Sequence, residues 1–244
     1  MEIIRVEETD STNNWILRHE ENLSGVTLVY CVNQTSGRGQ RGNTWESEPG
    51  KNITASIIFH PDNFPACQQF VISEAVALSI VDFLASMDVR AKVKWPNDIY
   101  VEDKKICGIL VEHKILGSEI SRTIAGFGIN INQTRFISEA PNPISVKMLT
   151  GENHEIDRAV NSLSLVLEKY LNALSEDKAA IHDEFISKLW RNDGSFYPFF
   201  DRKNNERINA RIKEVAKDGI LTLTDDSGND REFMFKEVEF LLNS

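Results

Sequence analysis

One apolar stretch near the middle of the chain, Phe70 to Met87, constrains the fold most. It is rich in alanine, valine, leucine and isoleucine at helical spacing and contains neither glycine nor proline. Apolar residues around most of a helix indicate that nearly all of its sides are buried. We therefore expect a core helix in an ordinary globular chain, which agrees with 41% hydrophobic and 26% charged residues.

Short β-prone runs lie on both sides of this helix. They are Ile3 to Val6, Val26 to Val32 and Ile53 to Phe59 before it, and Ala91 to Trp95, Ile99 to Val101, Ile106 to His113 and Thr123 to Ile131 after it. Glu102-Asp103-Lys104 is typical of a hairpin turn. The polar run from Thr9 to Asn14 predicts a capped helix start before Trp15, and two more helices are expected at about 157–174 and 178–190.

The last fifty or so residues have a different pattern. Ile208, Ala210 and Ile212 alternate with polar residues, a turn follows at Asp218-Gly219, and strands are expected at Ile220 to Leu223 and Phe233 to Phe235. This pattern predicts a small antiparallel sheet or barrel. We expect a main domain over residues 1–192 and a minor domain over residues 193–244.

Composition excludes several classes of protein. A formal net charge of -10 opposes duplex nucleic-acid binding, which usually needs a basic face. Cys31, Cys67 and Cys107 are scattered singly, so we expect reduced thiols and no zinc site. Without a signal peptide or a continuous run of about 20 apolar residues, the protein is expected in the cytoplasm and outside the membrane.

The segment Gln34 to Trp45 contains the most informative side chains. Its three glycines allow close approach of the backbone to an anion, and Arg38 and Arg41 supply charged forks for carboxylate or phosphate. Gly37 and Gly42 have the spacing of a phosphate-binding P-loop, but Asn43 stands where that motif needs lysine. Taken alone, the segment is as typical of a solvated loop or an RNA-binding patch as of an anion-binding loop.

Two further segments carry polar residues at strand ends. In Lys94-Trp95-Pro96-Asn97-Asp98 the tryptophan can give a purine a flat face, the carboxylate can orient a group or meet Mg²⁺, and the lysine can neutralise a phosphate. The segment is also good turn chemistry. In Gly126-Phe127-Gly128-Ile129-Asn130, glycines alternate with apolar residues along a strand. Such glycines indicate either a ligand packed on the sheet or a bulge.

Taken together, these segments resemble the biotin protein ligases over nearly the whole chain. The family's motifs stand here, in order, at Ser11 to Asn13, Gly37 to Trp45, Lys94 to Asp98, Lys105 to Leu110 and Gly126 to Asn130. The resemblance implies an α+β catalytic domain, with a mixed sheet and helices as in class II tRNA synthetases and lipoyl ligases, and a small SH3-like C-terminal β-barrel. It also implies ATP-dependent activation of biotin as an adenylate and transfer to a lysine of a biotin carboxyl carrier domain.

The resemblance assigns roles residue by residue. Lys105, Arg38 and Arg41 would be catalytic, cancelling the repulsion between biotin and ATP together with Mg²⁺. Biotin would contact Ser11, Thr12, Asn13, Gln34, Gly37, Arg38, Gly39, Gln40, Lys105 and Gly108. ATP would contact Arg38, Arg41, Trp45, Lys94, Trp95, Asn97, Asp98, Lys105 and Asn130. No metal ligands of the protein itself are expected.

The chain also departs from the family's patterns. Gln40 stands where many members have another arginine, so adenylate is expected to be held less tightly. The catalytic motifs begin within about ten residues of Met1, so we expect the monofunctional form, without the DNA-binding domain of bifunctional members. We expect the Gly37 to Trp45 loop to close over the adenylate.

Three alternatives stay open at this point. A lipoate or octanoate ligase uses the same scaffold, a non-catalytic biotin sensor would keep the pocket without the chemistry, and an RNA-binding module would use the Gly/Arg segment. The sequence does not fix the carrier protein, and pairing of sheet edges allows a homodimer.

Overall fold

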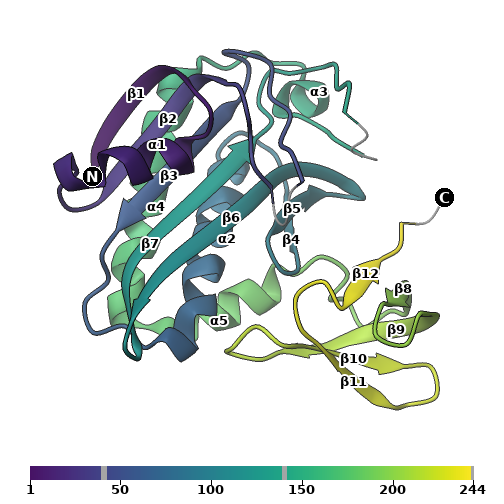
Figure 1. Cartoon of the computed structure of the whole chain (residues 1–244). Coiled ribbons are helices and arrows are strands. Elements are labelled where there is room, and N and C mark those ends of the chain that lie inside the picture. The colour runs from purple at the N-terminus through teal and green to yellow at the C-terminus, as the bar shows by residue number, and fades with distance from the viewer. Residues whose placement is uncertain (40–42, 139–141, 243–244) are drawn as a thin grey trace.

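The computed structural model describes residues 1–39, 43–138 and 142–242. Two sheets organise these residues (Figure 1). The larger sheet has seven strands in the order β1-β2-β3-β7-β6-β5-β4, and the smaller has five in the order β11-β10-β9-β8-β12. β1 and β2 are parallel and the other pairs of the large sheet are antiparallel, so the expected mixed sheet and α+β class are confirmed.

The chain forms these elements in sequence. The large sheet contains β1 (Glu2–Thr9), β2 (Thr27–Gln34), β3 (Ile53–Phe59), β4 (Lys92–Lys94), β5 (Asp98–Val101), β6 (Lys104–Leu116) and β7 (Glu119–Ile129). The helices are α1 (Thr12–His19), α2 (Gln69–Ala85), α3 (Val146–Thr150), α4 (Ile156–Glu176) and α5 (Lys178–Ser187). The small sheet contains β8 (Tyr197–Asp201), β9 (Glu206–Val215), β10 (Leu221–Asp225), β11 (Asp230–Phe233) and β12 (Val238–Phe240).

The helix α2 is the core of the main body. Thirteen of its seventeen residues are buried, and it packs on α4, α5 and the large sheet, as Figure 1 shows. With its leading turn, Ala66–Ala85 is long and apolar enough to cross a membrane, but 72% of its most apolar window is buried inside the protein. A buried core helix accounts for this composition.

The opposite face of the large sheet carries α1 and a row of small residues. Ile16 of α1 packs on Val29, Ile58 and Ile124 at one end of that face. Farther along β7, Gly126 and Gly128 lie on the α1 face of the sheet. The side chains of Ala125, Phe127 and Ile129 point to the opposite face, into the helical core. Gly128 pairs with Gly108 of β6 in regular register, so three neighbouring positions on this face have no side chain, and we call them the glycine floor (Gly108, Gly126 and Gly128).

The small sheet packs against the β4–β5 hairpin of the large one (Figure 1). The indole Nε1 of Trp95 donates a 3.0 Å hydrogen bond to the Gly219 carbonyl, and Phe235 packs edge-on against Trp95 and beside Phe70. The Arg191 guanidinium donates to the Leu241 carbonyl at 2.8 Å and lies on the Trp190 ring. An antiparallel sheet is therefore present at the expected C-terminal position, while the division at residues 192 and 193 stays a prediction.

Several elements differ from the expectation. The strand expected at Phe233 to Phe235 ends at Phe233, because the next residues form a turn in which the Met234 amide donates to the Glu237 carboxylate at 2.6 Å. The helix expected at about 178–190 ends at Ser187, before the left-handed Arg191 (φ 62). The short helix α3 and the strands β8 and β12 were not predicted at all.

Candidate functional site

A cavity of about 670 Å³ lies over the glycine floor. Its walls come from α1, from the loop after β2, from the β5–β6 hairpin and from the turn after β7. Of the residues assigned from the sequence, the cavity lining contains Ser11, Thr12, Asn13, Gln34, Arg38, Gly39, Trp45, Asn97, Asp98, Lys105, Gly108 and Asn130. Four segments far apart in the sequence thus meet at one site.

Protein side chains occupy the space above the glycine floor. A Cβ atom added to Gly126 would lie 2.2 Å from Asn13 Oδ1, and one added to Gly128 would lie 2.2 Å from Trp45 Nε1. Any larger residue would displace these side chains. The strand glycines therefore serve close approach of side chains, and no bulge interrupts the β6–β7 register at Gly108 and Gly128.

The Trp45 ring is the largest side chain over the floor. Its Nε1 is buried and has no hydrogen-bond partner among the described residues. Lys105 Nζ lies 5.6 Å from the ring centroid. A buried indole donor without a partner is costly.

The loop after β2 closes on itself like a hairpin. The Trp45 amide donates to the Gly37 carbonyl at 2.9 Å and the Gly39 amide donates to the Asn43 carbonyl at 2.7 Å. A Cβ at Gly37 would lie 2.4 Å from the Trp45 carbonyl oxygen. Gly37 therefore shapes the loop and does not line the cavity, while Gln40 and Arg41 lie outside the described residues.

One end of the cavity is a buried network of polar side chains. The Thr12 amide donates to Gln34 Oε1 at 3.0 Å, and the Thr12 and Ser56 hydroxyls lie 2.6 Å apart. Ser56 donates to Asn13 Oδ1 at 2.5 Å, and Asn13 Nδ2 donates to Glu112 Oε2 at 2.6 Å. Side chains from α1, β2, β3 and β6 thus form one connected chain of hydrogen bonds.

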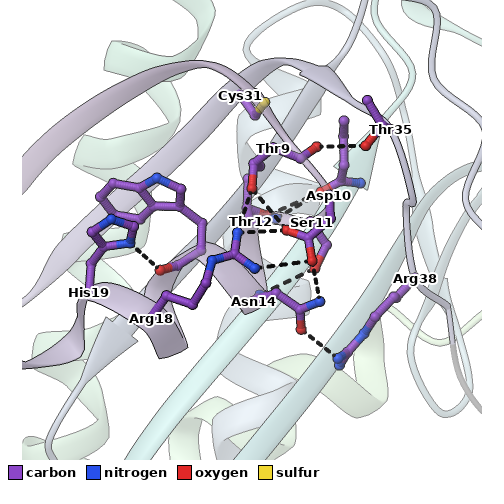
Figure 2. Close-up of polar contacts among 12 residues, drawn as sticks. Thr9, Asp10, Ser11, Thr12, Asn14, Arg18, His19, Cys31, Thr35 and Arg38 are labelled. Atoms are coloured by element: carbon purple, nitrogen blue, oxygen red, sulfur yellow. Dashed lines mark hydrogen bonds and ion pairs between the residues drawn. The ribbon is translucent and has the colours of Figure 1, made fainter.

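Arg38 is held by two groups beside this network. Its guanidinium donates to Asn14 Oδ1 at 2.8 Å and to Glu112 Oε1 at 2.6 Å. Figure 2 shows that Asn14 in turn donates to Asp10, which also binds Arg18. The hydrogen bonds from Arg18 and Asn14 hold the pKa of Asp10 well below its usual range. Asp10 is therefore ionised, and it holds Asn14 in the position from which Asn14 accepts from Arg38.

Lys105 lies farther along the cavity and is paired with Asp98. The two charged atoms are 2.7 Å apart across the β5–β6 hairpin. Burial alone would lower the pKa of Lys105, but the charge and hydrogen bond of Asp98 raise it. Lys105 is therefore a full cation in the wall of the cavity.

Asn97 and Asn130 complete this end. Asn97 Nδ2 donates to the Ile109 carbonyl, which ties the turn at Pro96 to strand β6. Asn130 Nδ2 donates to the Ile144 carbonyl at 3.0 Å, and its buried Oδ1 has no partner among the described residues. Asn130 Oδ1 is thus an unpaired buried acceptor at the same end of the cavity as Asp98 and Lys105. Such an atom suits a hydrogen-bond donor of a ligand, or a metal cation bound to a phosphate.

Two further assigned residues, like Gly37, do not line the cavity. Trp95 is 3% exposed and is used at the junction between the sheets, where Gly219 and Phe235 hold its ring. Lys94 lies between the rings of Tyr100 and Phe240, and burial lowers its pKa. The structure thus gives no support to their assignment as ATP contacts.

Other residues of the site were not anticipated. Ser56 and Glu112 belong to the polar network, and Glu46 and Lys236 line the cavity. Ser56 pairs with Gly126 across β3 and β7. The strand glycines, which indicate close approach to this face, were therefore the sequence signal that could have located Ser56. Lys236 belongs to the turn before β12, and no local pattern links that turn to the first sheet. Among the described residues, no group of three His, Cys, Asp or Glu side chains is placed to hold a metal ion.

Solved structures match the fold over nearly the whole chain. The structure superposes on a biotin protein ligase from Aquifex aeolicus in complex with biotin and ATP, with a TM-score of 0.80, 23% identity and 99% coverage of both chains. It also matches a biotin protein ligase from Leishmania major in complex with biotinyl-5-AMP, with a TM-score of 0.58, 18% identity and coverage of 96% and 98%. At these identities the likeness establishes the fold alone.

The sequence establishes the family. Residues 4–130 match the Biotin/lipoate A/B protein ligase family, and the chain belongs to this family. The bifunctional ligase/repressor BirA of Escherichia coli is 30% identical over 174 residues, which cover 68% of this chain and 51% of that protein. A biotin--[acetyl-CoA-carboxylase] ligase of Paracoccus denitrificans is 28% identical over 236 residues, covering 90% and 89%. The chain spans about half the length of the bifunctional relatives.

Proposed function

We propose that this protein is a biotin protein ligase, which joins biotin to AMP at the expense of ATP and transfers the biotinyl group to a lysine of a biotin carboxyl carrier domain. One observation carries the proposal: the cavity has a neutral hydrogen-bonding end at Thr12 and Gln34 and a cationic side at Arg38 and Lys105. The first suits the ureido ring of biotin. The second suits the carboxylate and the phosphates that must meet it.

In the first step the carboxylate of biotin attacks the α-phosphorus of ATP, and pyrophosphate leaves. Both reactants are anions, so catalysis consists largely of neutralising and aligning them. Lys105 and Arg38 are the described cations for this task, and Arg41 is a third by resemblance. Mg²⁺ arrives with the ATP phosphates, and Asp98 and Asn130 offer oxygen atoms on that side of the cavity.

In the second step the carrier lysine attacks the carboxyl carbon of the mixed anhydride, forming an amide and releasing AMP. No nucleophile of the enzyme is needed for either step. The relatives from Paracoccus denitrificans and Mycobacterium tuberculosis, named as biotin--[acetyl-CoA-carboxylase] ligases, support a carrier of a biotin-dependent carboxylase as the partner. The unpaired cysteines Cys31, Cys67 and Cys107 support a place in the reducing cytoplasm. The edge strand β1 offers a surface for a homodimer.

The test is ATP–pyrophosphate exchange by the purified protein with Mg²⁺ and one added acid. Exchange with biotin, and none with lipoate or octanoate, is the expected result. Exchange with the fatty acids alone would assign the chain to the lipoyl branch of its family. Biotin binding without exchange would indicate a sensor.

A further inference from the structure

Glu112 has no role in the proposed reaction, yet it joins two parts of the site. It lies on β6 opposite Ile124 of β7, so its side chain is on the same face as the glycine floor. One carboxylate oxygen accepts from Arg38 at 2.6 Å and the other accepts from Asn13 at 2.6 Å. About 38% of the side chain is exposed, so these contacts lie at the edge of the cavity.

The Glu112 carboxylate sets the direction of every hydrogen bond behind it. An ionised carboxylate only accepts, so the Asn13 amide must point its NH₂ group at Glu112 and its oxygen at Ser56. The Ser56 hydroxyl therefore donates to Asn13, and its oxygen can only accept from Thr12 at 2.6 Å. The Thr12 hydroxyl also lies 3.4 Å from Gln34 Oε1, but its hydrogen is directed to the closer Ser56.

This direction fixes what the cavity offers a ligand. With its hydrogen used on Ser56, the Thr12 hydroxyl presents only lone pairs and accepts from a ligand N–H. Gln34 uses its oxygen on the Thr12 amide, so its NH₂ group remains as the donor. An acceptor beside a donor matches a cyclic urea, which has N–H groups beside a carbonyl.

We propose that Glu112 is a positioning residue that determines this donor and acceptor pattern through Asn13 and Ser56, and so selects the ureido group. The inference rests on the proposed function, because it explains how the same cavity recognises biotin. Glu112 also holds Arg38 beside the polar end, so one carboxylate fixes both the neutral and the cationic side of the site.

The test begins with Glu112→Gln. The amide oxygen of glutamine can accept from Arg38, but its NH₂ group then faces the NH₂ group of Asn13. Asn13 must turn over, the Ser56 hydroxyl reverses and the Thr12 hydroxyl turns its hydrogen toward the ligand. We expect the KM for biotin in pyrophosphate exchange to rise about tenfold or more, as for a mismatched buried polar pair. The KM for ATP should change less than the KM for biotin, because the glutamine oxygen still accepts from Arg38, and the melting temperature should stay within a few degrees of wild type.

The rescue is the double variant Asn13→Asp with Glu112→Gln. Here the glutamine donates to the new aspartate, Ser56 still donates to the other aspartate oxygen, and Arg38 still has an acceptor. The original direction is restored, so the KM for biotin should return to within about threefold of wild type, a coupling that independent sites do not show. Asn13→Asp alone places two carboxylates together and should be impaired. Glu119→Gln, an exposed change on the same hairpin, is the matched control.

Two outcomes contradict the inference while leaving the proposed function intact. One is an unchanged KM for biotin in Glu112→Gln, and the other is a double variant no better than the single one. If Glu112→Gln does not fold, Ser56→Ala breaks the same chain deeper in the network and should also raise the KM for biotin alone; an unchanged value there overturns the inference. Absence of biotin-dependent exchange in the wild-type protein would instead overturn the proposed function, and this inference with it.

Discussion

At the scale of single residues, each described cation assigned to the reaction already has an anion. Arg38 is paired with Glu112 and Lys105 with Asp98, both at hydrogen-bonding distance. A ligand carboxylate or phosphate therefore exchanges partners with these side chains and does not meet unpaired charge. This arrangement leaves neither cation without a counter-charge, which would be costly for a group removed from water.

Lys105→Ala tests the cation closest to Asp98. The variant loses the charge that neutralises the two reacting anions, so biotin-dependent pyrophosphate exchange should fall by about a hundredfold or more. Lys104→Ala removes the exposed lysine beside it and should be nearly neutral. The melting temperature checks that Asp98, left unpaired, has not unfolded the hairpin. Near-normal exchange by Lys105→Ala would remove Lys105 from the mechanism.

Gln40→Arg tests retention of the adenylate. Gln40 lies outside the described residues, so the prediction rests on the sequence of the Gly/Arg loop. An added guanidinium gives a charge-assisted contact to the phosphate, and release of biotinyl-AMP should slow by about tenfold. Rapid filtration of the preformed complex measures this rate. Asn153→Arg adds the same charge at a residue that does not line the cavity, and equal slowing in that control would show an effect of net charge alone.

The sequence predicted twelve of the residues that line the cavity and missed those whose role depends on a distant partner. Thr12, Gln34 and Lys105 belong to local motifs, so their roles follow from short spacings. Trp45 and Trp95 have the same chemistry, and only the packing shows that the first lies in the cavity and the second at the junction of the sheets. The role of Glu112 depends on its contact with Asn13, which is 99 positions away in the sequence.

At the scale of elements, the pattern of apolar residues predicted the elements whose burial follows from their own sequence. β3 was predicted with its observed bounds, because a run of apolar and small residues leaves few alternatives. Helix α3 was missed because it has only five residues, although Ser145 caps its start and Gly151 (φ 81) ends it. β12 has three residues and exists only through its pairing with β8, which no local signal reveals.

The contact of α2 with α5 contains a buried acid that predicts a pH effect. Glu74 is 1% exposed, accepts from His182 at 2.7 Å, and has one buried oxygen without a partner among the described residues. Burial raises the pKa of Glu74, and the His182 contact offsets only part of this. The folded state thus holds this proton more tightly than the unfolded chain does.

Glu74→Gln should therefore change how stability depends on pH. For a raised pKa, the stabilising effect is complete below the unfolded value of about 4.3 and is lost as pH rises through the folded pKa. The neutral variant escapes this loss, so its melting temperature relative to wild type should increase from pH 4.5 toward pH 8. Thermal unfolding at several pH values measures the difference. Glu176→Gln at the exposed end of α4 is the control, and parallel profiles for Glu74→Gln and wild type would contradict the prediction.

At the scale of the whole molecule, the junction of the two sheets lies directly behind the cavity. Trp95 contacts Gly219 and Phe235 of the C-terminal part, and two residues later Asn97 lines the cavity. The turn that contains Phe235 also contains Lys236, another lining residue. The second sheet therefore supports the wall of the site from outside and contributes to its lining.

Trp95→Phe isolates one link in this junction. Phenylalanine keeps most of the ring contact with Phe235 but cannot donate to the Gly219 carbonyl, which is left buried and unpaired. The free energy of unfolding should fall by about 1–3 kcal/mol. Because the lost bond joins the two sheets, unfolding in urea should stay a single transition in wild type and broaden in the variant as the small sheet separates first. Trp15→Phe, at a ring stacked on His19 on the far side of the large sheet, is the matched control. Equal, sharp transitions in Trp95→Phe and wild type would show that the sheets are joined by apolar packing alone, and that the Trp95 hydrogen bond only fixes the orientation of the β4–β5 hairpin.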